Sequence, residues 1–163
     1  MSSRKKLTKY TAVAALAATG AIAALAFAQT PPAGPTPAER AIEYRQAVYK
    51  IVAGNFGPLA QVAQGKAPFD AAKARKNAER LAAIAAFLPD AYPDISKEGK
   101  TRAKPEVWTN RAEFDRRIAE FGEHTRALAV VTARSETASD EFKAAIGAVG
   151  NDCKGCHENF RSQ

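Results

Sequence analysis

Methionine, cysteine and histidine are all scarce in this sequence. Its 163 residues include one methionine, the initiator Met1, two cysteines and two histidines. A structural zinc ion takes four ligands, and beyond the C-terminal cysteines and their adjacent histidine the only other imidazole is that of His124. No basic stripe interleaved with aromatic residues is present, which argues against a nucleic-acid-binding surface. The few possible cofactor ligands therefore fall mainly in one segment, the last dozen residues.

The first 28 residues have the pattern of a secretory signal peptide. A basic start precedes an alanine-rich apolar run over residues 12–25, and Ala-Phe-Ala at 26–28 matches a cleavage site before Gln29. An uncleaved membrane anchor is the alternative, but the run is barely long enough to span a bilayer. Four of the 24 basic residues and none of the 17 acidic ones lie in this segment, so cleavage lowers the net charge from +7 to +3. It also removes Met1, and the mature protein then has no thioether and no segment of transmembrane length.

The last dozen residues contain the motif Cys153-Lys154-Gly155-Cys156-His157. A C-x-x-C-H run is the attachment signature of c-type haem, in which both thiols bond to the macrocycle and the imidazole ligates the iron. On a helix, Cys156 lies about 60° from Cys153 on one side and His157 about 40° away on the other. The three side chains therefore project from one face. A zinc site and a plain disulfide or thiol pair remain as alternatives, whereas a thioredoxin-like motif would need neighbouring strands. We predict one covalent haem c, with His157 as the metal ligand.

The second axial position of the iron has few candidate ligands. A methionine ligand is impossible in the mature chain, and His124 is the only other strong candidate. It lies on a helix whose apolar stripe is formed by Phe114, Ile118, Phe121 and Leu128, about 80° from the centre of that stripe. A histidine on such a flank is usually partly solvated, so we expect five-coordinate iron with one open face. Ligation by His124, which would make the iron six-coordinate, is the alternative.

Four amphipathic helices are expected after a linker over residues 29–36. The first begins with a capping box at Thr36-Pro37-Ala38-Glu39, and Gly57-Pro58 should kink or interrupt it. Asp70 opens the second helix, Thr109 caps the third, which runs to about residue 133, and Ser139 caps the fourth. A long polar connection over residues 89–104 separates the second helix from the third. The sequence predicts an all-α, antiparallel four-helix bundle over residues 37–163.

The second and fourth helices have the clearest core patterns. Apolar residues repeat at spacings of four and three in both, at Ala74, Ala78, Leu81, Ala85 and Leu88, and at Phe142, Ile146, Val149, Cys153, Cys156 and Phe160. Both cysteines therefore occupy core positions, and we expect the haem inside the bundle. Gly150 lies beside the expected position of the ring, where it either permits close approach or is incidental.

The chain resembles cytochrome c′, the class II c-type cytochromes, over residues 38–163. The resemblance rests on Ile42-Glu43-Tyr44-Arg45-Gln46, Asn55-Phe56-Gly57, residues 65–70, Pro105-Glu106-Val107-Trp108, residues 147–150 and the C-terminal C-x-x-C-H followed by Phe160-Arg161. It implies an antiparallel bundle, usually a homodimer, with five-coordinate haem in the periplasm. It also implies binding of NO and CO and little binding of O2.

The resemblance assigns roles to residues outside the motif. Arg45 and Gln46 match a pair on the first helix that contacts the haem propionates, and Tyr49 matches the distal position over the open face of the iron. Arg161 matches an arginine beside the ligating histidine, and Ala103 matches a loop contact to the haem.

Three functions follow from these features. The favoured one is a periplasmic haem protein that binds NO or CO and is capable of one-electron transfer. The alternative is a dedicated periplasmic electron carrier with six-coordinate haem and an unidentified redox partner. A haem enzyme such as a peroxidase would need a distal acid–base group, and Tyr49 is the only candidate, so we expect no enzymatic activity.

Overall fold

The computed structural model describes residues 34–163, which contain five α-helices and no β-strand. They are α1 (Pro37–Ala63), α2 (Ala71–Ala85), α3 (Glu106–Thr109), α4 (Arg111–Arg134) and α5 (Asp140–Phe160). Two short 3₁₀ turns, Pro89–Ala91 and Asp94–Ser96, lie in the connection between α2 and α3. The predicted signal peptide (1–28) and most of the predicted linker (29–36) lie outside the described residues.

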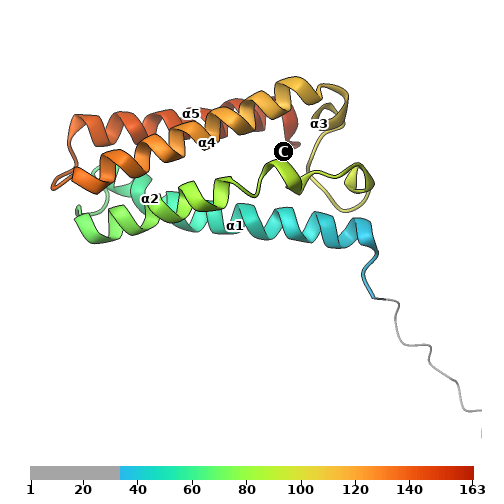
Figure 1. Ribbon diagram of the computed structural model, residues 1–163, viewed down its shortest axis with the longest axis horizontal. Helices are drawn as coiled ribbons and strands as arrows, with labels where there is room; N and C mark the ends of the chain where they lie inside the picture. Colours follow the sequence, from blue (N-terminus) through green and yellow to red (C-terminus); the bar gives the residue numbers. More distant parts are fainter. Residues whose placement is uncertain (1–33) are drawn as a thin grey trace, which may run out of the picture. The chain divides into compact units, whose positions relative to one another are not determined.

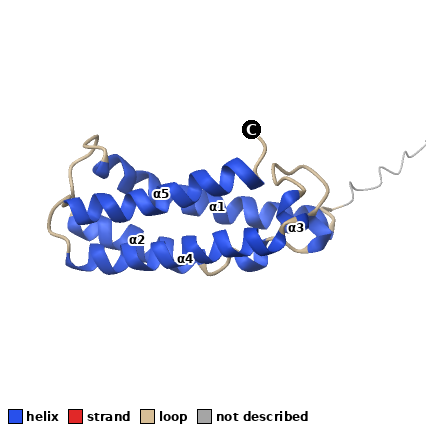
Figure 2. Cartoon of the chain, turned by 90° about the horizontal axis from the view of Figure 1, so that it is seen from above, coloured by secondary structure: helices blue, strands red, loops and turns tan. Residues whose placement is uncertain are grey.

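The four long helices form the predicted antiparallel bundle, in which α1, α2, α4 and α5 run alongside one another (Figures 1 and 2). The start of α1, the 89–104 connection, α3 and the C-terminus gather at the same end of the bundle (Figure 1). We call this the C-terminal end. It brings together segments that are far apart in the sequence, and it is where α5 presents its C-x-x-C-H motif.

Three of the four predicted helix starts are confirmed. Thr36 and Glu39 form the reciprocal capping box of α1, while Asp70 and Ser139 accept backbone N–H bonds at the starts of α2 and α5. The prediction for Thr109 is wrong, because this residue ends α3 and α4 begins after Asn110. The hydroxyl of Thr109 donates backward to the carbonyl of Pro105, at 3.3 Å, in place of capping the next helix.

Helix α1 is not interrupted at Gly57-Pro58 and continues to Ala63. A proline inside a helix removes one backbone hydrogen bond and clashes with the preceding turn. Helix α1 has 27 residues, and Leu59, directly after the proline, is 1% exposed. Packing of the last turn against the core therefore offsets the cost of the proline.

The core follows the predicted stripes closely. All five residues of the seam predicted for the second helix are buried, although α2 ends at Ala85 and Leu88 follows it. The four named α4 residues and the α5 residues Phe142, Ile146, Val149 and Phe160 are buried as well. Cys153 and Cys156 are half-buried and pack against this core. Among the helices of residues 34–163, none combines the length and the apolar character needed to cross a membrane.

The stability of the bundle should depend strongly on the α2 seam. Leu81 is fully buried, so Leu81→Ala should lower the free energy of unfolding by about 2–5 kcal/mol through lost burial and a residual cavity. Val130 is 61% exposed on α4, and Val130→Ala is the matched control, with an expected change within about 0.5 kcal/mol. Guanidinium unfolding of both variants measures the difference, and equal losses would contradict the assignment of this seam to the core.

Candidate haem-binding site

The C-x-x-C-H motif occupies the last two turns of α5 (Asp140–Phe160). Cys153 and Cys156 continue the side of the helix on which Val149 and Phe160 are buried, and both thiols are free. The side chain of His157 is exposed, and the helix ends when the N–H of Arg161 bonds to the carbonyl of His157 at 3.3 Å. The thiols of Cys153 and Cys156 and the imidazole of His157 therefore project from neighbouring sides of the last two turns of α5. The predicted haem attachment requires this arrangement.

The two thiols are in their neutral form. Burial, followed by the charges of Asp152 and Cys156, raises the pKa of Cys153 to about 11, and burial also raises the pKa of Cys156. Zinc sites and dithiol redox pairs depend on thiolates with lowered pKa values. Within residues 34–163, no three His, Cys, Asp or Glu side chains gather in an arrangement that holds a metal ion. Within the described residues, the surroundings of the thiols therefore supply no set of zinc ligands.

Helix α1 forms the opposite wall of this site. Among the neighbouring pairs of long helices, α1 and α5 pack least extensively against each other. A planar macrocycle between two helices requires such a separation, whereas closely packed helices would exclude it. A Cβ atom on Gly150 of α5 would lie 3.8 Å from the ring of Phe56 on α1. That is an ordinary contact, so this glycine is not required for the packing of the two helices.

Tyr49 lies on the wall formed by α1. Its side chain is half-buried, packs against the core together with Cys153 and Cys156, and has its ring 6.5 Å from that of Tyr92. The pKa of Tyr49 is raised well above its ordinary value, first by burial and then by Tyr92 and the two cysteines. The predicted distal residue therefore lies beside the attachment motif as a neutral phenol.

Arg45, one turn before Tyr49, is 3% exposed and is held by the 89–104 connection. Its guanidinium donates to the Ser96 hydroxyl at 2.7 Å, the Ser96 carbonyl at 3.2 Å and the Thr101 hydroxyl at 2.6 Å. It also lies over the rings of Tyr92 and Trp108, at 5.1 and 5.8 Å from their centres. None of these partners is anionic. A buried guanidinium without a carboxylate partner is costly, so this site favours an anionic group such as a propionate.

Trp108 has the one buried side-chain donor in residues 34–163 that lacks a hydrogen-bond partner, its indole N–H. Buried polar groups in native proteins are nearly always paired. Because the indole lies against Arg45, this part of the protein has both a positive charge and an unused donor. Both features fit an acceptor group of a bound cofactor.

Gln46, Ala103 and Arg161 lie around the same end of the bundle. The side chain of Gln46 is exposed and donates to the carbonyl of Lys100 at 3.2 Å. Ala103 and Arg161 form an isolated antiparallel bridge, flanked by backbone hydrogen bonds from Lys104 to Phe160 (3.0 Å) and from Ser162 to Arg102 (2.8 Å). We call the pairing of residues 102–104 with 160–162 the C-terminal clasp. It places Ala103 and Arg161 together next to the motif.

The clasp also makes the surroundings of His157 electropositive. The pKa of His157 is lowered, chiefly by partial burial and then by the charges of Arg161 and Arg102. A lowered pKa favours the neutral imidazole, which is the form that ligates iron.

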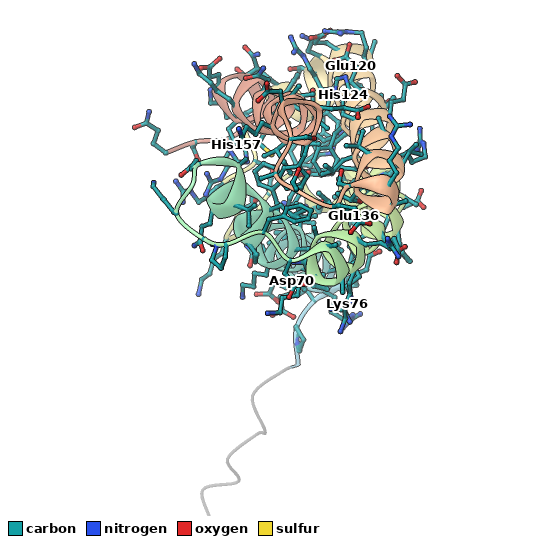
Figure 3. The ribbon with its side chains drawn as sticks, turned by 90° about the vertical axis from the view of Figure 1, so that its left-hand side faces the viewer. Asp70, Lys76, Glu120, His124, Glu136 and His157 are labelled. Carbon is teal, nitrogen blue, oxygen red and sulfur yellow. The ribbon has the colours of Figure 1, made fainter. Side chains whose placement is uncertain are left out.

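His124 is only partly solvated, as its position on α4 predicted, with 44% of its side chain exposed. Its Nδ1 atom is 2.7 Å from an Oδ atom of Asp152 on α5. Residues 152 and 157 are separated by about 140° around a helix. In the view along the bundle, the labelled His124 and His157 lie on different sides of α5 (Figure 3). The structure thus pairs His124 with a carboxylate and does not bring it to His157.

Several residues of this site carry no recognisable sequence pattern and were not predicted. Tyr92, Ser96 and Thr101 surround Arg45 but lie in a connection without helical periodicity, so no pattern marked them. Residues 89–104 contain only one Tyr, one Ser and one Thr, so the composition of the segment gave no signal either. Asp152 was also missed, although it directly precedes the motif.

An antiparallel bundle of four long helices with C-x-x-C-H at the end of the last helix defines a helical c-type haem protein. The family model for cytochrome c′ matches residues 40–161, and the chain belongs to the cytochrome c′ family. Proteins of this family carry one covalently bound c-type haem per chain.

Individual relatives cover nearly the whole domain. A cytochrome c′ of Rubrivivax gelatinosus is 37% identical over 124 residues, which are 76% of this chain and 95% of the relative. Among solved structures, cytochrome c prime from Shewanella frigidimarina is 34% identical, with a TM-score of 0.74 over 77% of this chain and 97% of that one. A nitric oxide complex of a variant of cytochrome c prime from Alcaligenes xylosoxidans is 32% identical, with a TM-score of 0.70 over 77% and 96% of the two chains.

The hydrogen bonds of Arg45 should contribute measurably to stability. Ser96 is fully buried, and its hydroxyl accepts from Arg45 while donating to the carbonyl of Pro93 at 2.8 Å. Ser96→Ala should therefore cost about 1–3 kcal/mol of unfolding free energy, because it leaves a buried charged donor unpaired. Thr109→Ala, which removes an exposed hydroxyl at the same end of the bundle, is the control and should cost less than about 0.5 kcal/mol. Urea unfolding checks both, and an unaffected Ser96→Ala variant would contradict the role given to Arg45.

Proposed function

We propose that the protein holds one haem by thioether bonds to Cys153 and Cys156 and by ligation of its iron to His157. We further propose that it binds NO or CO at the opposite face of the iron and is capable of one-electron transfer. The observation that carries this proposal is the pairing of His124 with Asp152 in a chain whose only methionine is Met1. Neither of the side chains that commonly fill the second axial position is available there. The nitric oxide complex of the relative from Alcaligenes xylosoxidans supports the choice of ligand.

When bound, the haem supplies an iron centre that coordinates a diatomic gas and changes its oxidation state by one electron. The protein supplies the surroundings of that centre. Tyr49 and the apolar residues of α1 form a wall beside the motif, where they restrict the access of water and of ligands larger than a diatomic gas. The phenol of Tyr49 stays neutral, so this position of the wall carries no charge.

Four residues at the C-terminal end of the bundle complete the proposed haem contacts. Arg45 contributes the buried positive charge that faces the propionates, and Gln46 contributes an exposed amide one position later. Ala103 contacts the edge of the haem, and Arg161 lies beside His157, where its charge lowers the basicity of the imidazole. The clasp supports these assignments by holding Ala103 and Arg161 together.

We also propose export to the periplasm and assembly as a homodimer. The export proposal rests on the signal-peptide pattern of residues 1–28. The proposed dimer surface is the outer side of α1, where Tyr44 and Ile51 are 43% and 49% exposed. These residues are two turns apart and therefore share one face of the helix. We propose no catalytic residues, since Tyr49 is the one side chain that we place over the open face of the iron, and a phenol with a raised pKa is a poor acid–base group.

The spectrum of the purified protein tests the proposed coordination. The ferrous protein should show a broad, high-spin Soret band that changes sharply when NO or CO is added. The variant His124→Ala should show the same spectrum, because His124 is bound to Asp152 and not to the iron. A low-spin spectrum that does not respond to CO, and that becomes high-spin in His124→Ala, would contradict the proposal and favour a six-coordinate electron carrier.

Tyr49 should control the rate at which ligands enter. Tyr49→Leu exchanges the half-buried phenol for a smaller apolar group, so the association rate of CO should rise by about tenfold or more if the ring obstructs entry. Phe87→Leu, a change to an aromatic residue that is 52% exposed and lies outside the proposed site and dimer surface, is the control and should leave the rate unchanged. Stopped-flow or flash-photolysis kinetics of both variants provide the measurement. Equal CO rates in the wild type and Tyr49→Leu would show that Tyr49 is not the distal gate.

A further inference from the structure

Arg117 of α4 lies directly against the attachment motif of α5. A Cβ atom added to Gly155, the second residue between the two cysteines, would lie 3.2 Å from Nη1 and 3.9 Å from Cζ of Arg117. Ordinary van der Waals contacts of a Cβ atom are 3.4–4 Å long. The guanidinium therefore occupies space into which any larger residue at position 155 would place its side chain.

Gly155 differs in this respect from the other glycines of α5. A Cβ atom on Gly147 would meet nothing within 4 Å, and one on Gly150 would make only an ordinary contact at 3.8 Å. All three glycines lie inside the helix, where glycine is less favourable than alanine. The close approach of Arg117 supplies a packing reason for glycine at position 155, and position 147 has no such reason.

Arg117 is held in place from its own helix. Its Nε atom is 2.8 Å from Oε1 of Glu113, one turn earlier on α4, and 31% of its side chain is exposed. Arg116 also pairs with Glu113, but it extends to Glu120 and is 49% exposed. Two adjacent arginines thus share one carboxylate, and the less exposed of the two lies against α5.

A second contact shows that the same face of α4 packs along the motif. His124 follows Arg117 by seven residues, which is about two turns, so both residues lie on nearly the same side of α4. His124 contacts Asp152, and Arg117 contacts Gly155 three residues later on α5. The side of the motif that faces α4 is therefore lined by two polar contacts, the second of which supplies a positive charge.

The charge of Arg117 also acts on the second attachment cysteine. Burial raises the pKa of Cys156, and Arg117 opposes this shift by favouring the thiolate. In the haem-loaded protein, the same sulfur atom is bonded to the macrocycle. A cation beside it favours the ferrous over the ferric state, because reduction removes one positive charge from the iron.

We propose that Arg117 is a further residue of the haem site, that it raises the reduction potential of the iron from the α4 side of the motif, and that Gly155 permits its approach. The proposal rests on the proposed covalent haem and deepens its one-electron transfer. Arg117 acts through its charge and not as a ligand of the iron.

Redox titration of the haem-loaded protein tests the effect of this charge. Arg117→Gln should shift the equilibrium constant for reduction by about twofold or more toward the ferric state. This is a fall of about 18 mV or more in the potential, since a tenfold change corresponds to 59 mV for a one-electron couple. Arg117→Lys keeps the charge and should retain most of the wild-type potential. Added salt should reduce the difference between the wild type and Arg117→Gln, because a partly exposed charge is screened.

Arg116→Gln is the matched control, because it removes the same net charge at the adjacent position from a side chain that pairs within α4. Its shift should be clearly smaller than that of Arg117→Gln. Equal shifts would overturn the proposal, since net charge alone would then explain them, and an unchanged potential in Arg117→Gln would overturn it as well. Failure of the wild type to bind CO would instead overturn the proposed function, while a shift specific to Arg117 would still support its role beside the haem.

The urea midpoint of unfolding tests the close approach by a measurement that does not involve the redox state of the iron. Gly147→Ala should raise the midpoint, because alanine favours a helix and nothing obstructs its side chain. Gly155→Ala should raise it less or lower it, because its Cβ atom would lie too close to Arg117. In the Arg117→Gln background, Gly155→Ala should raise the midpoint as much as Gly147→Ala does.

The potential should follow the same pattern. Gly155→Ala should lower it in the wild-type background, because the displaced guanidinium moves away from the motif, and should lower it no further in Arg117→Gln. Gly147→Ala should leave it unchanged. Equal rises of the midpoint in the two glycine variants, or additive falls of the potential in Gly155→Ala and Arg117→Gln, would overturn the role given to Gly155.

Discussion

The buried guanidinium of Arg45 is the constraint on which the C-terminal end of the bundle depends. A charge that is 3% exposed must be hydrogen-bonded almost completely, and the 89–104 connection supplies these bonds through Ser96 and Thr101. The hydroxyl of Thr101 also accepts a hydrogen bond from the backbone N–H of Ala103, at 3.0 Å. Thr101 therefore links Arg45 to the C-terminal clasp. One charged side chain on α1 thereby fixes the course of a segment that has no periodic structure of its own.

This connection joins the two sides of the proposed haem site. On one side, the ring of Tyr92 lies under Arg45 and makes an edge contact with the ring of Tyr49. On the other side, Ala103 pairs with Arg161 beside His157. Gly99 makes the tight course of the connection possible, because its φ of 121° is unfavourable for other residues and an added Cβ would lie 2.9 Å from Ile42. The connection is therefore a structural part of the site and not only a link between α2 and α3.

The fold and the attachment motif could be predicted because both depend on local patterns. The 4-3 spacing of α5 placed both cysteines on the core side, and the capping residues of α1, α2 and α5 marked the helix starts. Thr109 was assigned wrongly because a cap signal cannot show that its hydroxyl is used by Pro105. The Arg45–Ser96 and His124–Asp152 pairs join residues that are 51 and 28 positions apart. Such pairs depend on how the helices dock, which local patterns do not reveal.

The C-terminal clasp also determines the order in which parts of the molecule form. Helices assemble from contacts between near neighbours, whereas the clasp joins Arg102 to Ser162, 60 positions later. Closing a loop of that length costs entropy that is repaid only after α4 and α5 have packed together. The strand-like pairing at the end of the chain should therefore be the last part to fold. It should also be the first to exchange its amide hydrogens with the solvent.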